Sequence, residues 1–525
     1  MKTAPITAGL AALLCGTALA IPEGPDSPSA EWTQREALNY AKVGEAPAEQ
    51  LANPDFLLRW EEQNLANTLE WNQRAIDDPS WLGVPSGNTM VTPLCTVWRE
   101  QCAGDPFRYP DAPGPDGAAF YTDEAEVIPV LFYDRGCARI SGRVWAPRNG
   151  GNGLPAVVIE NGSVQAPETL YWWAAQALVR SGYVVMSFDP RGQGRSDQQT
   201  PAGEQGSNIN PAVFWHGLVD AIDFFRSSSV QPYPHNLTCA GTYPTEVTAF
   251  NPHIGRIDPT RLGIAGHSLG AAGVSVVQGY GADGADPWPG LIDTGNPVDV
   301  AVAWDSLSAP GSSAPGSSAT PAIVPRVPAM GQTSEYGLTP VPFLQPPDPE
   351  SDKAAYAAWR DAGLPVFQFT IQGSSHYEWS LLPTFPTTSW CPDTSSGACA
   401  GGWGQPMAEH YSVAWFDRWL KNAGEPGYAD ADARLLADAD WQARYSFYLR
   451  SARAFPDRGG GAHVCDDIRA GCTDLEIAGP GTGGSDSGGG GALGWLTVVA
   501  VMAMVLLRNA TSLRSPSPLQ GERVG

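Results

Sequence analysis

The sequence predicts an α/β fold, in which a mostly parallel sheet has helices on both faces and carries a helical N-terminal segment and loop insertions. From residue 125 onward, short apolar runs alternate with segments of helical spacing, which is typical of strands buried on both sides. Between one apolar run and a run of small residues lies a G-x-S-x-G pentapeptide at residues 266–270. The length of 525 residues suffices for one large domain with additions.

The individual elements are predicted from their apolar periodicity. The expected strands share short apolar or alternating patterns: residues 126–133, 138–145, 154–160, 183–188, 262–265, 298–304, 327–330 and 366–371. The expected helices share helical spacing of their apolar positions: residues 169–180, 214–225 and 411–420. Two long insertions interrupt the alternation: residues 227–258, and a loop with the tandem repeat Ala-Pro-Gly-Ser-Ser at 309–318.

Residues 31–85 are expected to form mostly polar helices that precede this alternation. Leu58, Leu65, Leu69 and Ile76 recur at steps of seven, four and seven residues, which places them on one side of a helix. We therefore expect this side of the helix to pack on the body of the protein.

Ser268 is the candidate nucleophile. The apolar run 262–265 predicts a strand before it, and the small residues 271–277 permit a helix after it. In such a junction, Gly266 and Gly270 let the chain fold back tightly, so the serine hydroxyl is held up at the end of the strand. The alternative interpretation is a glycine-rich turn whose serine caps a helix.

Composition argues against one class of partner. The 31 basic and 55 acidic residues leave a formal net charge of −24, whereas nucleic-acid phosphates require clustered Lys and Arg. Hydrophobic residues make up 42% of the chain, so a large core can be buried. We expect no nucleic-acid partner and no cofactor.

The first twenty residues have the features of a secretory signal peptide. Lys2 supplies the positive end, residues 6–14 the apolar stretch, and Ala18-Leu19-Ala20 the small residues of a cleavage site. An N-terminal anchor is disfavoured because the apolar stretch is too short to span a bilayer. We therefore expect an exported protein whose mature chain begins at residue 21.

The cysteines agree with export. Cleavage leaves eight of the nine cysteines, and an even number in an exported chain suggests disulfides. Proximity in the sequence suggests three pairs and a remainder, with other pairings left open: Cys95–Cys102, Cys391–Cys399, Cys465–Cys472 and Cys137–Cys239. A metal site is not expected, because the sequence has no Cys-x-x-Cys and no histidine at ligand spacing.

The C-terminal end has three compositional parts. Residues 481–491 are almost only small and polar, residues 492–507 are apolar and uncharged, and Arg508 begins a tail over 508–525. A helix over the apolar part would reach about 24 Å, slightly short of a hydrocarbon core of about 30 Å. This order resembles the bacterial GlyGly-type sorting signal, which implies cleavage by a rhomboid-like sorting protease. The alternative is a permanent transmembrane anchor; either way, membrane contact is expected through this segment only.

Three motifs together carry a second resemblance. Besides the G-x-S-x-G turn, residues 189–196 form a D-x-R-G-x-G-x-S turn after an expected strand, and the Gly-Ser-Ser-His sequence 373–376 follows the last expected strand. On these motifs, residues 125–453 resemble the α/β-hydrolase superfamily. Residues 21–124 lie outside the resemblance and are expected to pack on its core, and residues 454–480 form a cysteine-containing extension.

A serine nucleophile needs a base, and the base needs an orienting acid. The resemblance implies the chain order serine, acid, histidine. Of the seven histidines, His376 is the one that follows an expected final strand in a Gly/Ser loop, from which it can reach Ser268. His267 adjoins the nucleophile and is expected to point away from it. We therefore expect His376 to be the base.

The resemblance offers two positions for the acid and two oxyanion donors. Glu335 follows the penultimate expected strand, the usual acid position of the family, whereas Asp305 ends the strand before it. We favour Glu335 and keep Asp305 as the alternative, because Asp is the commoner residue in the family. The expected oxyanion donors are the N–H groups of Leu269 and Ser163.

These inferences predict an exported serine hydrolase that cleaves a carboxylic ester or related acyl bond through an acyl-enzyme. The expected substrate is a small-molecule or lipid-like acyl compound. An acyltransferase or peptidase with the same triad is an alternative, because surrounding loops decide the acceptor and the leaving group. A catalytically dead hydrolase scaffold that binds a partner at the cell surface is disfavoured, because all three candidate triad members are present.

Overall fold

A single mixed sheet organises the body of the protein. The computed structural model describes residues 28–81, 120–163, 167–206, 210–314, 319–338, 343–380, 389 and 402–472. Within these residues, ten strands pair in the order β1-β2-β4-β3-β5-β6-β7-β8-β9-β10. Their bounds are β1 (Ala125–Tyr133), β2 (Arg139–Pro147), β3 (Leu154–Glu160), β4 (Val184–Phe188), β5 (Ile257–His267), β6 (Val300–Trp304), β7 (Ala329–Ser334), β8 (Val366–Ile371), β9 (Ala452–Pro456) and β10 (Ala462–Cys465).

The sheet is parallel at its centre, where β4, β3, β5, β6, β7 and β8 run in one direction. Antiparallel strands flank both ends, with β1 and β2 on one side and β9 and β10 on the other. A mostly parallel sheet with helices is an α/β fold, so the predicted fold class is confirmed at this level.

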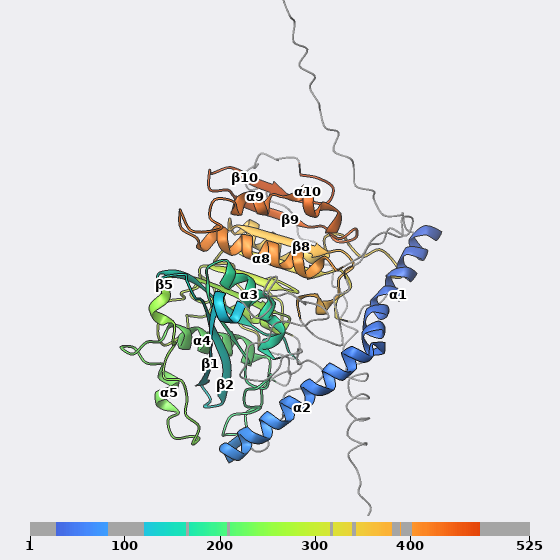
Figure 1. Ribbon diagram of the computed structural model, residues 1–525. Coiled ribbons are helices and arrows are strands. Elements are labelled where there is room, and N and C mark those ends of the chain that lie inside the picture. The colour runs from blue at the N-terminus through green and yellow to red at the C-terminus, as the bar shows by residue number, and fades with distance from the viewer. Residues whose placement is uncertain are drawn as a thin grey trace, which may run out of the picture.

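Helices cover both faces of the sheet (Figure 1). Their bounds are α1 (Ala30–Ala52), α2 (Pro54–Asp77), α3 (Trp172–Arg180), α4 (Ala212–Arg226), α5 (Pro234–Thr238), α6 (Leu269–Val277), α7 (Ala354–Asp361), α8 (Gly404–Leu420), α9 (Ala431–Leu435) and α10 (Asp438–Trp441). Helices α3 and α8 pack on one face, where Trp173 and Trp415 belong to the core. Helices α4, α6 and α7 pack on the other face, with Phe224 and Trp359 in a second core.

Strand β3 shows why apolar runs rather than alternating patterns mark this sheet. Val157 and Ile159 belong to the core under α3 and α8, whereas Ala156 and Val158 belong to the core under α4 and α6. Successive side chains of a strand point to opposite faces, so a strand covered on both sides carries apolar residues on both. The predicted bounds of this strand, 154–160, agree with the structure.

The strand order reverses at β3, and this reversal positions the candidate site. Strand β3 lies between β4, which follows it in sequence, and β5, which comes later. Where neighbouring connections diverge in this way, a crevice opens beyond the carboxyl ends of the strands. Asn161 directly follows β3, and Ser268 directly follows β5. The candidate nucleophile therefore lies at the reversal point.

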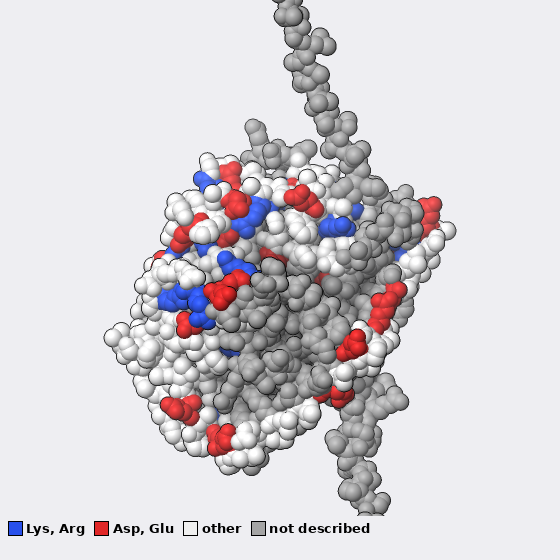
Figure 2. Space-filling model, in the orientation of Figure 1, with Lys and Arg blue, Asp and Glu red and all other residues white. Residues whose placement is uncertain are grey.

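The N-terminal helices form as expected, but the prediction of their packing face is wrong. Leu58, Leu65, Leu69 and Ile76 are each at least 60% exposed. Helix α2 runs along the outside of the body (Figure 1), and acidic side chains follow the same two helices on the surface (Figure 2). Helical spacing fixes which residues share a side, but it does not fix which side meets the core.

The N-terminal segment is held instead near the two ends of its helix pair. At the start of α1, the Glu36 carboxylate accepts hydrogen bonds from the Tyr448 hydroxyl and, at 2.9 Å, from the Phe343 N–H. After α2, the Ser80 hydroxyl accepts a bond of 2.7 Å from the guanidinium of Arg139. Near Glu36, Trp32 also packs with Tyr448 and Leu449 in a small apolar cluster. Contacts at these two places thus replace the expected apolar stripe.

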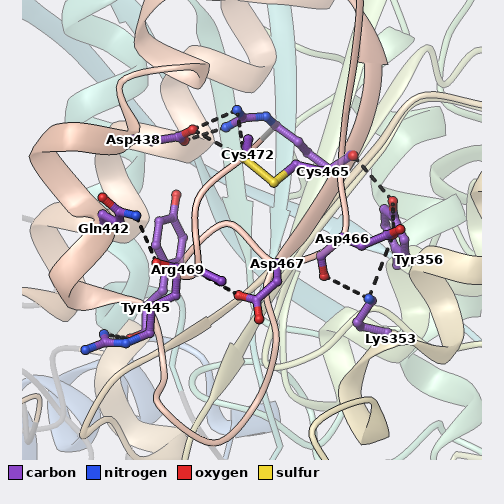
Figure 3. The surroundings of a disulfide bond; sticks show 12 residues. Lys353, Tyr356, Asp438, Gln442, Tyr445, Cys465, Asp466, Asp467, Arg469 and Cys472 are labelled. Atoms are coloured by element: carbon purple, nitrogen blue, oxygen red, sulfur yellow. Dashed lines mark hydrogen bonds and ion pairs between the residues drawn. A yellow bond between two sulfur atoms is a disulfide. The ribbon is translucent and has the colours of Figure 1, made fainter. Parts of the chain in front are cut away.

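The first part of the expected extension, up to Cys465, pairs with the sheet, and residues 473–480 lie outside the described residues. The expected boundary falls inside β9, which pairs with β8 and with β10. The Cys465–Cys472 disulfide closes a short loop at the end of β10 (Figure 3). In this loop, the Asp466 carbonyl accepts a bond of 2.9 Å from Lys353, and the Arg469 carbonyl accepts one of 2.8 Å from Gln442.

Two of the four expected disulfides form among the described residues, Cys137–Cys239 and Cys465–Cys472. The pairs Cys95–Cys102 and Cys391–Cys399 lie outside the described residues, as do the expected signal peptide, the linker 481–491, the apolar segment 492–507 and the tail 508–525. In the part of the chain that is described, no helix combines the length and the apolar character needed to cross a membrane.

The two disulfides are expected to differ in their contribution to stability. Cys137–Cys239 joins positions 102 residues apart and Cys465–Cys472 positions 7 apart, so the first restricts the unfolded chain more. In the chain-entropy model, replacing the first pair by serines lowers the free energy of unfolding by about 4 to 5 kcal/mol, and replacing the second by about 2 to 3 kcal/mol. Guanidinium titration of both double variants, with the wild type as reference, measures the difference. An equal or reversed order would contradict this account.

Candidate active site

Ser268 occupies a tight junction between β5 and α6. Its backbone has φ 60° and ψ −120°, in the positive-φ region that side chains other than glycine rarely adopt. A Cβ at Gly266 would lie 2.5 Å from the carbonyl oxygen of Gly270, and a Cβ at Gly270 would lie 2.5 Å from the carbonyl oxygen of Asn161. Both positions therefore exclude any side chain, and the junction has the geometry of a nucleophile elbow.

Three side chains from three strand ends form a continuous hydrogen-bonded chain. The Ser268 hydroxyl lies 2.9 Å from Nε2 of His376, and Nδ1 of His376 lies 2.6 Å from Oδ2 of Asp305. Ser268 follows β5, Asp305 follows β6, and His376 follows β8. A nucleophile, a base and an acid that orients the base require this order of hydrogen bonds.

The carboxylate against His376 is Asp305, not the favoured Glu335. Glu335 instead accepts bonds from the N–H of Gly373, at 2.7 Å, and from the hydroxyl of Ser446, at 2.5 Å. Ser334, at the end of β7, faces Asp305 and donates to it through its N–H and its hydroxyl. Neighbouring side chains of an extended chain point to opposite sides, so Glu335 faces away from the imidazole.

Glu335 nevertheless supports the loop that carries the base. Its bond to the Gly373 N–H fixes the start of the turn after β8. Next to it, the N–H of His376 donates to the Gly337 carbonyl at 2.9 Å, and the N–H of Tyr336 donates to the Ser374 carbonyl at 3.1 Å. The segment after β7 thus holds the segment after β8 by backbone pairing.

Electrostatics favour an ionised Asp305. Burial opposes the charged form, but hydrogen bonds from His376 and from Ser334 outweigh it and lower the pKa of the Asp305 carboxyl. An ionised carboxylate accepts a hydrogen bond from the Nδ1–H group of His376. In the neutral imidazole this leaves Nε2 without a proton and able to accept one from Ser268. In contrast, burial raises the pKa of Glu335.

The loop after β3 lies against the nucleophile. A Cβ at Gly162 would lie 3.2 Å from the Ser268 Cβ, so the absence of a side chain allows this approach. The N–H of Gly162 donates to the Tyr171 hydroxyl at 3.0 Å, and it is therefore engaged elsewhere. Ser163 follows in the same loop, and Leu269 begins α6, whose first N–H groups face its N-terminal end. Both stay predicted oxyanion donors.

The D-x-R-G-x-G-x-S turn holds this loop through hydrogen bonds to Asp189. Oδ1 of Asp189 accepts from the side-chain amide of Asn161 at 2.9 Å and from the N–H of Glu168 at 2.6 Å, and Oδ2 accepts from the N–H of Arg195 at 2.9 Å. A Cβ at Gly194 would lie 2.4 Å from the Asp189 carboxylate. Burial raises the pKa of Asp189 to about 6. The motif therefore serves to hold both sides of the loop after β3.

Two residues without a predicted role also contact the site, Tyr171 and His267. Nδ1 of His267 lies 2.8 Å from the Tyr171 hydroxyl, and Nε2 of His267 lies 2.9 Å from the carbonyl oxygen of His376. Both ring nitrogens of His267 bond to groups other than Ser268, and Nε2 reaches the loop that carries His376. The position of His267 directly before Ser268 is the one feature of the sequence that could have indicated this contact.

Comparison with known proteins adds no assignment. No family model matches the sequence, and no curated protein matches it either. Within the described residues, no group of three or more His, Cys, Asp or Glu side chains could hold a metal ion. The chemical interpretation therefore rests on the geometry of the site.

The two buried carboxylates provide a direct test of the geometry. Asp305→Asn removes the acceptor of the hydrogen bond from Nδ1–H and favours the wrong tautomer of His376. The rate at which a fluorophosphonate phosphonylates Ser268, with loss of fluoride, should therefore fall by up to about 10⁴-fold. Glu335→Gln keeps an acceptor oxygen for Gly373 and should change this rate far less, while it lowers the melting temperature. Labelling kinetics and thermal unfolding of both variants give the comparison. A larger kinetic loss in Glu335→Gln would restore Glu335 as the acid.

Proposed function

We propose that this protein is a serine hydrolase with an α/β-hydrolase fold that cleaves a carboxylic ester or a related acyl bond. The observation that carries the proposal is the unbroken chain from the Asp305 carboxylate through His376 to the Ser268 hydroxyl. The strained elbow backbone and the reversal of strand order at β3 support it further.

In the proposed reaction, Nε2 of His376 accepts the proton of Ser268 while the serine oxygen attacks the acyl carbon. Asp305 stabilises the imidazolium that forms. The N–H groups of Leu269 and Ser163 would stabilise the oxyanion, a contribution of roughly 3 to 4 kcal/mol per donor in related chemistry. His376 then protonates the leaving alcohol, and water, activated by the same imidazole, releases the acid from Ser268.

Export belongs to the same proposal. The disulfides Cys137–Cys239 and Cys465–Cys472 support an oxidising environment, in which such bonds persist. With the signal-like residues 1–20, they favour a body on the non-cytoplasmic side of the membrane. We further propose that residues 492–507 either anchor the protein in the membrane or are cleaved by a rhomboid-like sorting protease.

Active-site labelling tests the proposed function. The wild type should react covalently with a fluorophosphonate probe and hydrolyse short-chain p-nitrophenyl esters, whereas Ser268→Ala should lose both activities without unfolding. Ser312→Ala removes an exposed loop serine and is the matched control, which should keep both. Mass spectrometry of the labelled peptide identifies the modified residue.

Three results would decide against an ester hydrolase. A wild type that is folded but not labelled would favour a binding protein on an inactive scaffold. Labelling that persists in Ser268→Ala would assign the nucleophile to another residue. Labelling at Ser268 with turnover of peptides, or with acyl transfer to an added alcohol in preference to water, would favour a peptidase or acyltransferase.

A further inference from the structure

A row of hydrogen bonds near Ser268 joins the loop after β3 to the loop that carries His376. The N–H of Gly162 lies 3.0 Å from the Tyr171 hydroxyl, which lies 2.8 Å from Nδ1 of His267. Nε2 of His267 lies 2.9 Å from the carbonyl oxygen of His376. The row therefore begins in the loop after β3 and ends on the main chain of the base.

The direction of each bond in this row follows from donor and acceptor chemistry. A backbone N–H can only donate and a carbonyl can only accept, so the Tyr171 hydroxyl accepts from Gly162 and Nε2 of His267 donates to His376. The one hydroxyl proton of Tyr171 is then donated to Nδ1 of His267. Only a neutral His267 with its proton on Nε2 satisfies the whole row.

The surroundings keep His267 neutral. Burial and the nearby His376 ring lower the pKa of His267 to about 3. The two imidazole rings have centroids 4.6 Å apart, so a second positive charge would face the imidazolium formed at His376 during catalysis. A neutral imidazole can hold the base by a hydrogen bond without opposing its protonation.

Packing fixes both members of the row. Tyr171 and His267 are 2% and 4% exposed. The Tyr171 ring is nearly parallel to that of Trp304, with an interplanar angle of 8° and centroids 6.4 Å apart, and Trp304 directly precedes Asp305. Neither side chain can leave its place without disturbing the ends of β5 and β6.

We propose that Tyr171 and His267 are positioning residues. They hold the loop after β3, which carries the expected oxyanion donor Ser163, and His376 at fixed positions relative to Ser268. His267 is joined covalently to the nucleophile, Tyr171 reaches the loop that approaches Ser268, and the Nε2 bond of His267 reaches the main chain of His376. One row thus connects three strand ends that must be aligned to a fraction of an ångström for catalysis. This inference rests on the proposed function.

Tyr171→Phe tests the row because it removes one oxygen and keeps the ring. Two bonds are lost, so kcat for a p-nitrophenyl ester should fall roughly 10- to 100-fold with little change in KM. The rate of fluorophosphonate labelling at Ser268 should fall in parallel. Tyr183→Phe is the matched control, because it removes an equally buried hydroxyl that donates to Asp417 at 2.7 Å, away from the site. It should lower the melting temperature and leave kcat unchanged.

His267→Gln supplies the second arm of the experiment. The glutamine amide can still donate to the His376 carbonyl but has no acceptor in the place of Nδ1, so a smaller loss of kcat, roughly 3- to 10-fold, is expected. In the double variant Tyr171→Phe/His267→Gln, the loss should equal that of Tyr171→Phe alone, because the row is already broken.

The outcomes separate this inference from the proposed function. A wild type that is not labelled at Ser268 contradicts the proposed function itself. If the wild type is labelled, a Tyr171→Phe variant with wild-type kcat overturns the positioning role and leaves the proposed function intact. Equal losses of kcat in Tyr171→Phe and Tyr183→Phe, or additive losses in the double variant, would also overturn it. If Tyr171→Phe fails to fold, His267→Gln replaces it as the test. An unchanged kcat in His267→Gln would then overturn the positioning role.

Discussion

The close approach of the elbow to the end of β3 is the contact on which the site depends. Gly270 lies against the backbone of Asn161, and Gly266 lies against Gly270, in both cases at distances that no side chain permits. The surrounding packing can therefore hold Ser268 at a positive φ that it would otherwise avoid. Because the loop after β3 is part of this contact, Ser268 and the Gly162 backbone keep a fixed separation.

Buried carboxylates around the site differ in role because their partners differ. Asp305 faces an imidazole and has a lowered pKa, whereas burial raises the pKa of Asp189 and of Glu335. Asp189 holds the loop after β3, and Glu335 holds the loop that carries His376. Fully bonded buried groups of this kind stiffen their surroundings, because an alternative arrangement would leave a polar atom unpaired. Two of these carboxylates therefore hold loops in place, and the third bonds to the His376 imidazole.

Prediction from sequence succeeded where one local segment carries the signal and failed where two segments must meet. The elbow around Ser268 and the loop position of His376 were predicted from the residues beside them. The preference for Glu335 was wrong. The family resemblance indicates after which strand the acid lies, but it does not indicate toward which side the residue's side chain points. Tyr171 gave no signal at all, since its hydroxyl has a role only through His267, which is 96 positions away.

The sequence by itself determined the α/β class, most element positions and the strand–turn–helix junction at Ser268, because apolar periodicity and glycine placement act over a few neighbouring residues. Tertiary structure alone decided that Asp305 meets His376, 71 positions along the chain, and that the stripe from Leu58 to Ile76 faces solvent. Both depend on how whole strands and helices are set against one another. Hydrogen bonds form or fail over less than an ångström, a distance that residue spacing in the chain does not specify.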